Sequence, residues 1–395
     1  MPNYNLRRFA HPSVFKSVSP TTLWEFLVPH KSFLAEKGFG LPDDCRGMSD
    51  FDYLMLTSIL MTPQEDGSPD LVDALFFTHE MASEQTMDDL LDIAAAIGLA
   101  IADETTPLDL AMQIWIADRE ALERKHSQQH ITKTRTFEHY QAECPLAFLA
   151  PQPESVAEME AAMDEWFIKH KRGGDSKLFT YPSANDVWFL VRHGDSYKRE
   201  SAVQGNKSKG IFYRPETFDV ICYVPALGEL RVHAKTKGER DLYRREFGRL
   251  LARNTGHFSG QDKYTLEPLL GQGEGSLKCG DIDGIDWIML RELHVRKSAI
   301  HFRFTVVYKD SNVFAILREL KETLGRSDVL VRATFLIRFD GEDKARTVTI
   351  TPPNRVQLRR DNDGEPVERW LRARGFVTGS VEDAVEESGE FLVGV

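Results

Sequence analysis

Cysteine is scarce and scattered in this chain of 395 residues. The four cysteines are Cys45, Cys144, Cys222 and Cys279. None has a neighbour at the short spacing of a zinc or redox pair, which excludes a CxxC-based site. A lone cysteine in an apolar stretch, such as Cys222, is usually buried and inert. We therefore expect a reducing, cytoplasmic setting.

Long apolar runs are also missing. No stretch approaches the roughly 18 consecutive apolar residues that a membrane-spanning helix needs, so no membrane association is expected. Arg7 and Arg8 near the N-terminus are not followed by an apolar run, so we expect no signal peptide. Hydrophobic residues make up 42% of the chain and charged residues 28%. This composition is typical of a protein with a buried core, and the length favours two or three domains.

The common motifs of nucleotide and acyl chemistry do not occur. The sequence has no GxxxxGK[ST] phosphate loop, no GxGxxG after a strand and no HExxH. It also lacks the GxSxG of serine hydrolases. ATP-driven chemistry and acyl transfer therefore have no support.

Positive charge is in short supply overall but is concentrated in one region. The chain carries 49 Lys and Arg against 61 Asp and Glu, for a net charge of −12. Residues 1–165 hold 11 cationic against 28 acidic residues, whereas residues 166–260 hold 18 against 10. A basic region within an acidic chain attracts polyanions. Scattered surface charge, or pairing between the two regions, is the alternative interpretation.

The first 150 residues show helical patterns. Ser19-Pro20, Ser68-Pro69 and Thr106-Pro107 each combine an N-cap residue with a proline suited to the first turn. Apolar residues follow each start at helical spacing. We therefore predict an acidic, all-helical domain over residues 1–150, able to bind protein partners.

After a proline-rich linker near residue 150, alternating apolar and polar residues predict strands. The fold class is α+β: an all-helical N-terminal domain, then a mixed, largely antiparallel sheet region with packed helices. The predicted divisions are a basic α+β domain at 151–260, a C-terminal α+β domain at 261–379 and an acidic tail at 380–395.

A flexible basic loop is predicted between Val191 and Arg214, with a strand at Gly210–Arg214. Its cationic residues alternate with glycine, serine and tyrosine, so it could follow a phosphate backbone while tyrosines stack on bases. A mobile, solvated connection is the alternative. The charged helix Lys237–Asn254 adds further cations. The candidate nucleic-acid-binding residues are Arg192, Lys198, Arg199, Lys207, Lys209, Arg214, Arg240, Arg244 and Arg245.

The stretch Phe218–Gly248 reads as a strand, a tight turn, a second strand and a helix. It carries Asp219 on the first strand, and Glu229, His233 and Lys235 on one face of the second, because strand side chains alternate. This layout resembles the PD-(D/E)xK nuclease core, in which carboxylates hold Mg²⁺ and a lysine activates water. The resemblance implies Asp219, Glu229, His233 and Lys235 as catalytic residues, and Asp219 and Glu229 as metal ligands. His233 stands where that core has a carboxylate, and an ordinary solvated hairpin is the alternative.

Three functions follow from these patterns. The leading hypothesis is a non-catalytic binding subunit of a multi-component machine acting on nucleic acid, for example in bacterial genome defence. It needs no cofactor, and its basic middle region contacts nucleic acid or another polyanion. The second is a Mg²⁺-dependent nuclease at the hairpin. The third is a purely structural adaptor.

Overall fold

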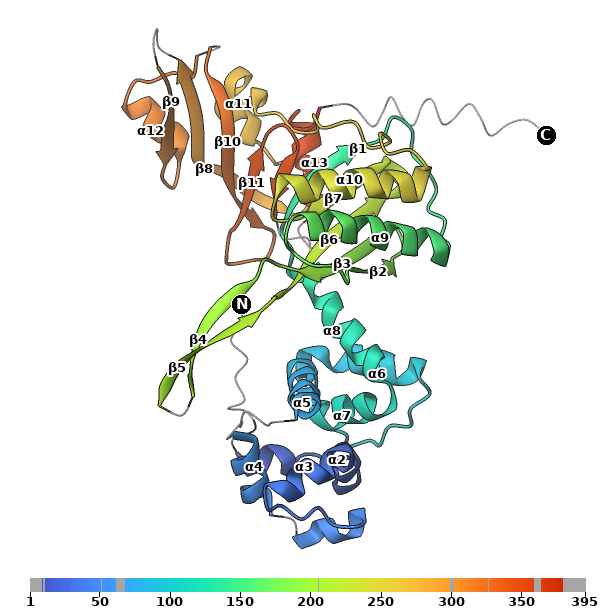
Figure 1. Cartoon of the computed structure of the whole chain (residues 1–395). Coiled ribbons are helices and arrows are strands. Elements are labelled where there is room, and N and C mark those ends of the chain that lie inside the picture. Colours follow the sequence, from blue (N-terminus) through green and yellow to red (C-terminus); the bar gives the residue numbers. More distant parts are fainter. Residues whose placement is uncertain are drawn as a thin grey trace, which may run out of the picture. The chain divides into compact units, whose positions relative to one another are not determined.

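A computed structural model describes residues 9, 11–50, 52–61, 68–204, 206–298, 302–325, 327–358 and 364–378. The chain forms two compact units, Met1–Gln129 and His130–Val395, both drawn in Figure 1. The predicted acidic tail at 380–395 lies outside the described residues.

The first unit is helical. Its helices are α1 (Pro12–Lys16), α2 (Pro20–Leu27), α3 (Lys31–Glu36), α4 (Tyr53–Met61), α5 (Pro69–Met81), α6 (Met87–Ala96), α7 (Pro107–Ala117) and most of α8 (Arg119–Lys133). The predicted N-caps are confirmed: the side chains of Ser19, Ser68 and Thr106 each accept a backbone hydrogen bond from the first turn of α2, α5 and α7. Such caps satisfy amide groups that have no partner within the helix.

The second unit is built on one antiparallel sheet of ten strands in the order β2-β3-β6-β7-β1-β12-β11-β10-β8-β9. The strands of this sheet are β1 (Thr136–Gln141), β2 (Lys177–Pro182), β3 (Val187–Gly194), β6 (Glu216–Val224), β7 (Glu229–His233), β8 (Ile285–Ser298), β9 (Arg303–Lys309), β10 (Val329–Phe339), β11 (Arg346–Thr351) and β12 (Arg355–Gln357). The remaining strands of the described residues, β4 (Lys198–Gln204) and β5 (Lys207–Tyr213), pair with each other in a separate two-stranded sheet.

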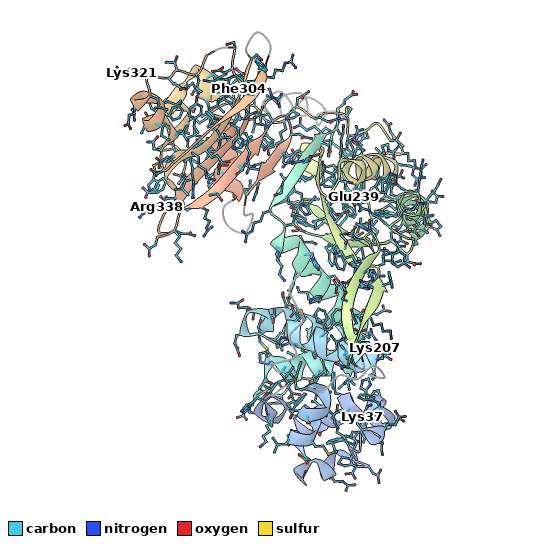
Figure 2. All side chains as sticks on the ribbon, turned by 60° about the vertical axis from the view of Figure 1, so that its left-hand side comes forward. Lys37, Lys207, Glu239, Phe304, Lys321 and Arg338 are labelled. Atoms are coloured by element: carbon cyan, nitrogen blue, oxygen red, sulfur yellow. The ribbon has the colours of Figure 1, made fainter. Side chains whose placement is uncertain are left out.

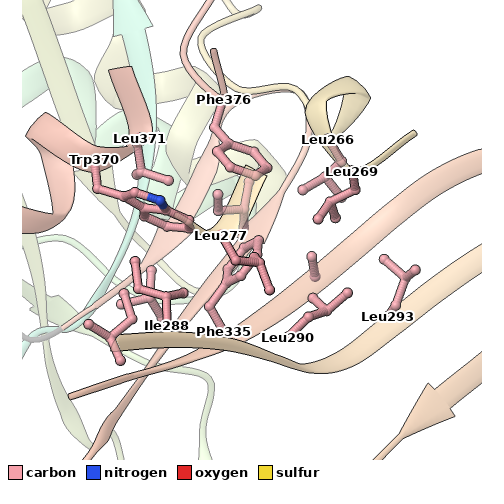
Figure 3. Packing of buried hydrophobic residues seen from close by; sticks show 14 of the residues in the cluster. Leu266, Leu269, Leu277, Ile288, Leu290, Leu293, Phe335, Trp370, Leu371 and Phe376 are labelled. Atoms are coloured by element: carbon pink, nitrogen blue, oxygen red, sulfur yellow. The ribbon is translucent and has the colours of Figure 1, made fainter. Parts of the chain in front are cut away.

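Helices cover opposite faces of the two halves of this sheet. On the β2–β1 half, α9 (Pro153–Lys169) and α10 (Lys237–Ala252) lie over one face of the sheet (Figure 1). The buried residues under them include Phe189, Ile221 and Val232. The β12–β9 half is packed by α11 (Glu267–Gly271), α12 (Val313–Glu319) and α13 (Gly364–Ala373). Figure 3 shows Trp370 and Leu371 of α13 packed over Phe335 of β10.

The strand register shows that these two covered faces are opposite. Tyr140 lies among the residues under α9 and α10, whereas its strand neighbour His139 points to the other side of β1. Val356 pairs with Phe137 on that other side, and Ile350 pairs with Val356 beneath α11–α13. The short pairing of β1 with β12 therefore joins two halves whose helices lie on opposite sides.

The predicted α+β class is confirmed, with helices over residues 12–133 followed by a largely antiparallel sheet and packed helices. The segments 151–260 and 261–379 both contribute strands to the one ten-stranded sheet. Among the described residues, no helix combines the length and the apolar character needed to cross a membrane.

Candidate functional site

The strands β4 and β5 of the second unit form an exposed basic pair, which we call the ribbon. The sequence predicted a flexible loop over most of this segment, but the structure contains two paired strands, from Lys198 opposite Tyr213 to Gln204 opposite Lys207. The ribbon projects away from the ten-stranded sheet, and Figure 2 labels Lys207 near its tip. Its cationic residues Lys198, Arg199, Lys207 and Lys209 are all exposed.

The ribbon presents different chemistry on its two faces. Residues directly opposite one another in the pairing share a face, which places Lys198, Lys207 and Lys209 together. Glu200 lies on the same face and accepts a 2.7 Å hydrogen bond from the hydroxyl of Tyr213. The other face carries Arg199, whose guanidinium lies 5.9 Å from the ring centroid of Phe212. Phe212 is 67% exposed, so an aromatic ring in solvent accompanies the charge.

Arg214 anchors the base of the ribbon. Its guanidinium donates a 2.7 Å hydrogen bond to the carbonyl of Lys171 and lies 4.3 Å from the ring centroid of Tyr197. Its aliphatic stem packs on Gly194, where a Cβ atom would come within 2.5 Å of Cδ of Arg214. Arg214 and Gly194 therefore pack closely where the ribbon meets β3.

The other arginines predicted to bind nucleic acid differ in how free their side chains are to contact a ligand. Arg192 pairs with Glu216 at 3.7 Å, and Arg240 pairs with Glu138 at 2.7 Å. Arg244 donates to the carbonyl of Phe258 at 3.3 Å. Arg245, by contrast, is exposed on α10. The structure thus places Arg192, Arg214, Arg240 and Arg244 in internal contacts, and leaves the four ribbon cations and Arg245 facing solvent.

The four residues predicted as a nuclease site do not converge. Val220 pairs with His233, so His233 and Glu229 lie on the face of Val220, and Asp219 points to the opposite side of the sheet. Asp219 and Glu229 therefore cannot ligate one ion. His233 bonds through Nδ1 with the carbonyl of Thr136 at 2.8 Å. Lys235 forms an exposed ion pair with Asp195 at 3.2 Å.

Glu229 belongs to a buried charge network between β7 and α13. Its carboxylate lies 2.5 Å from Nζ of Lys263 and 2.6 Å from Nε of Arg231, which also reaches Glu368 at 3.3 Å. Nδ1 of His139 lies 3.1 Å from the same carboxylate. Burial opposes ionisation of Glu229, but the three basic neighbours outweigh it and hold its pKa well below the ordinary value.

Asp219 instead forms part of a second buried cluster beneath α10. Its Oδ2 atom accepts a 2.8 Å hydrogen bond from the hydroxyl of Tyr243 and lies 3.0 Å from Nε2 of His193. Burial, together with Asp219, holds the pKa of Tyr243 well above its ordinary value, so the phenol stays protonated. Glu239 completes the cluster from the first turn of α10.

This cluster has the donor set of a metal site, but its ligands already have partners. His193, Asp219 and Glu239 each offer an atom within 4.8 Å of the others, and imidazole with carboxylates suits a transition metal better than Mg²⁺. However, Glu239 binds the guanidinium of Arg172 and accepts the backbone N–H of Thr236 at 2.5 Å. The cluster therefore acts chemically as a closed network that fixes the start of α10 on the sheet.

His193 and Glu239 are not among the predicted site residues. Glu239 had a local signal, because Thr236 followed three residues later by a glutamate is a capping-box pattern. The structure contains this capping box. His193 had no such signal, since its contact with Asp219 depends on how β3 aligns with β6.

No protein-family model matches the chain, and no curated protein is significantly similar to it.

Proposed function

We propose that this protein binds nucleic acid and that the ribbon is its principal contact with duplex. The observation that carries the proposal is the set of four exposed cations, Lys198, Arg199, Lys207 and Lys209, on a strand pair outside the main sheet. Over residues 197–214 the segment holds five cationic residues and one acidic residue. This local excess contrasts with the net charge of −12 for the whole chain.

The shape of the ribbon suits a duplex. The major groove of B-DNA is wide enough to admit a two-stranded antiparallel ribbon. Lysines on one face would then contact phosphates, while Arg199 on the other face would reach base edges or the opposite backbone. Because phosphate contacts release condensed counterions, binding would weaken steeply as salt increases.

The helical unit is proposed to bind a protein partner within the same assembly. Two of its apolar side chains support this role: Leu54 is 71% exposed and Ile116 is 40% exposed. A partner that covered these side chains would remove apolar surface from water, which favours association. The binding subunit would then couple nucleic acid to its partner without catalysis of its own.

The test is duplex binding measured by fluorescence anisotropy at about 50 mM and about 200 mM salt. The variant K198Q/K207Q/K209Q removes the lysine face of the ribbon. We expect a loss of affinity of about tenfold or more at the lower salt. The slope of log affinity against log salt should flatten by about 2 to 3, because three phosphate contacts are lost.

A matched control removes the same number of exposed lysines elsewhere in the second unit, as K169Q/K278Q/K321Q. It should bind duplex like the wild type. Equal losses in the two variants would mean that only overall charge matters, and the ribbon would not be the contact. Absence of duplex binding by the wild type at about 50 mM salt would refute the function itself.

A further inference from the structure

One face of the β8–β9–β10 sheet carries no helix of the described residues. The opposite face packs against α11, α12 and α13 through Leu290, Leu293 and Phe335. Register places Thr334 opposite Glu292 and Leu336 opposite Met289 on the side away from those helices. We call the side that carries these four residues the bare face. It lies on the same side of the sheet as α9 and α10, which cover only the other half.

The bare face is rich in arginine. Arg296 pairs opposite Thr305, and Arg332 pairs opposite His294, so both arginines belong to this face. Arg303 lies on the same face of the edge strand β9, two positions from Thr305. All three arginines are exposed, and within the described residues none forms an ion pair.

Among the described residues of this face, the acidic Glu292 and Asp286 already form ion pairs. Glu292 lies 2.7 Å from Nε2 of His294 and 2.8 Å from Nζ of Lys309. The hydrogen bond from Lys309, followed by that from His294, lowers the pKa of Glu292 to about 2. Asp286 pairs with Arg338 at 3.2 Å. Arg338 lies near the end of β10 and is labelled in Figure 2. The three remaining arginines therefore give this face a net positive charge.

An aromatic ring, an aliphatic side chain and two threonines lie among these charges. Trp287 is opposite Arg338 and is half-buried, and Val307 is 50% exposed opposite His294. Thr305 and Thr347, which carry hydroxyl groups, are exposed. Unpaired bases stack on such rings and rest on apolar side chains, and guanidinium groups and hydroxyls bind the phosphates and sugars between them.

We propose that the bare face binds single-stranded nucleic acid, with Arg296, Arg303 and Arg332 on the phosphates and Trp287 under a base. A broad sheet cannot enter a groove of a duplex as the two-stranded ribbon can, but it can support splayed bases. This proposal rests on the proposed nucleic-acid function for its class of ligand. It assigns a different substrate form to a different surface, so the two can be separated.

The experiment compares two probes, oligothymidine of about 20 nucleotides and a blunt duplex of similar length, using the full chain and fluorescence anisotropy. The variant R296Q/R303Q/R332Q should lose about tenfold or more in affinity for the single strand and keep its affinity for the duplex. The salt slope for the single strand should flatten by about 2, since single strands release fewer counterions per contact than duplexes do. The ribbon variant K198Q/K207Q/K209Q should show the reverse pattern.

Two further variants separate charge from damage to the fold. R296K/R303K/R332K keeps the charge and should recover most of the single-strand affinity, whereas K169Q/K278Q/K321Q should bind like the wild type. Unchanged single-strand binding by R296Q/R303Q/R332Q would overturn the bare-face proposal. Failure of the ribbon proposal would appear separately, as unchanged duplex binding by the ribbon variant.

Discussion

His139 is a fully buried imidazole in β1 whose Nε2 atom has no hydrogen-bond partner within the described residues. Its Nδ1 atom lies 3.1 Å from Glu229 and 3.3 Å from Nζ of Lys263. Burial, and then the positive charge of Lys263, hold the pKa of His139 well below its ordinary value of 6.5. The folded protein therefore keeps this ring neutral at a pH where the unfolded chain would protonate it.

This difference predicts a pH-dependent stability. Below pH 6.5 the unfolded chain binds a proton at His139 that the folded chain does not bind. The free energy of unfolding should then fall by up to about 1.4 kcal/mol for each pH unit below that value. His139→Gln removes the titrating group, so its stability should depend less on pH between 6.5 and 5. Urea unfolding across this range gives the comparison. Parallel curves for the variant and the wild type would exclude His139 as the source.

Single residues also show what the sequence could and could not predict about the candidate site. Alternation along a strand correctly places Glu229 and His233 on one face of β7. Whether Asp219 joins them depends on the register across the turn, and one position reverses the side to which a residue points. The 3-10 turn Pro225–Leu227, with Gly228 at φ +56°, sets that register. No residue pattern within β6 or β7 specifies it.

At the scale of elements, helix starts were predictable and the ribbon was not. Ser19, Ser68 and Thr106 cap their helices through contacts made within one turn, so local sequence suffices. A strand is predicted where apolar and polar residues alternate, because one side of such a strand is buried and the other faces solvent. No described side chain of the ribbon is buried, and polar residues occupy both sides of β4, so this signal is absent.

The ribbon base gives a prediction of local mobility. Arg214→Gln removes the hydrogen bond to the carbonyl of Lys171 and the packing on Tyr197. Amide exchange over residues 198–213 should then accelerate about tenfold, because the strand pair has few other buried contacts. Hydrogen exchange with mass spectrometry measures this change. Arg199→Gln removes the same charge from an exposed position and should leave exchange at the ribbon base unaltered. Wild-type exchange rates in Arg214→Gln would exclude the anchoring role.

For the stability of the second unit as a whole, the junction between the two halves of the sheet is the critical region. Only three paired positions connect β1 with β12. The network of Glu229, Arg231, Lys263 and Glu368 lies beside them and links β7 with α13. A buried ion pair contributes little net stability when intact, but removing one member leaves the other charges unpaired.

Glu229→Gln should therefore destabilise both halves together. The variant leaves Lys263 and Arg231 buried without their shared carboxylate, which should cost about 3–5 kcal/mol in the free energy of unfolding. Hydrogen exchange should show lost protection in β7 and in α13. Glu200→Gln, on the exposed ribbon, should change stability by no more than about 0.5 kcal/mol. A loss confined to β7 would show that the network does not couple the halves.

The ribbon also has a consequence for how this chain can be varied. It is inserted between β3 and β6, and these strands pair up to Gly194 opposite Glu216, immediately beside the insertion. A two-residue turn could close the same hairpin without changing any register in the sheet. Insertions, deletions and charge changes in the ribbon are therefore compatible with an unchanged strand register in the ten-stranded sheet.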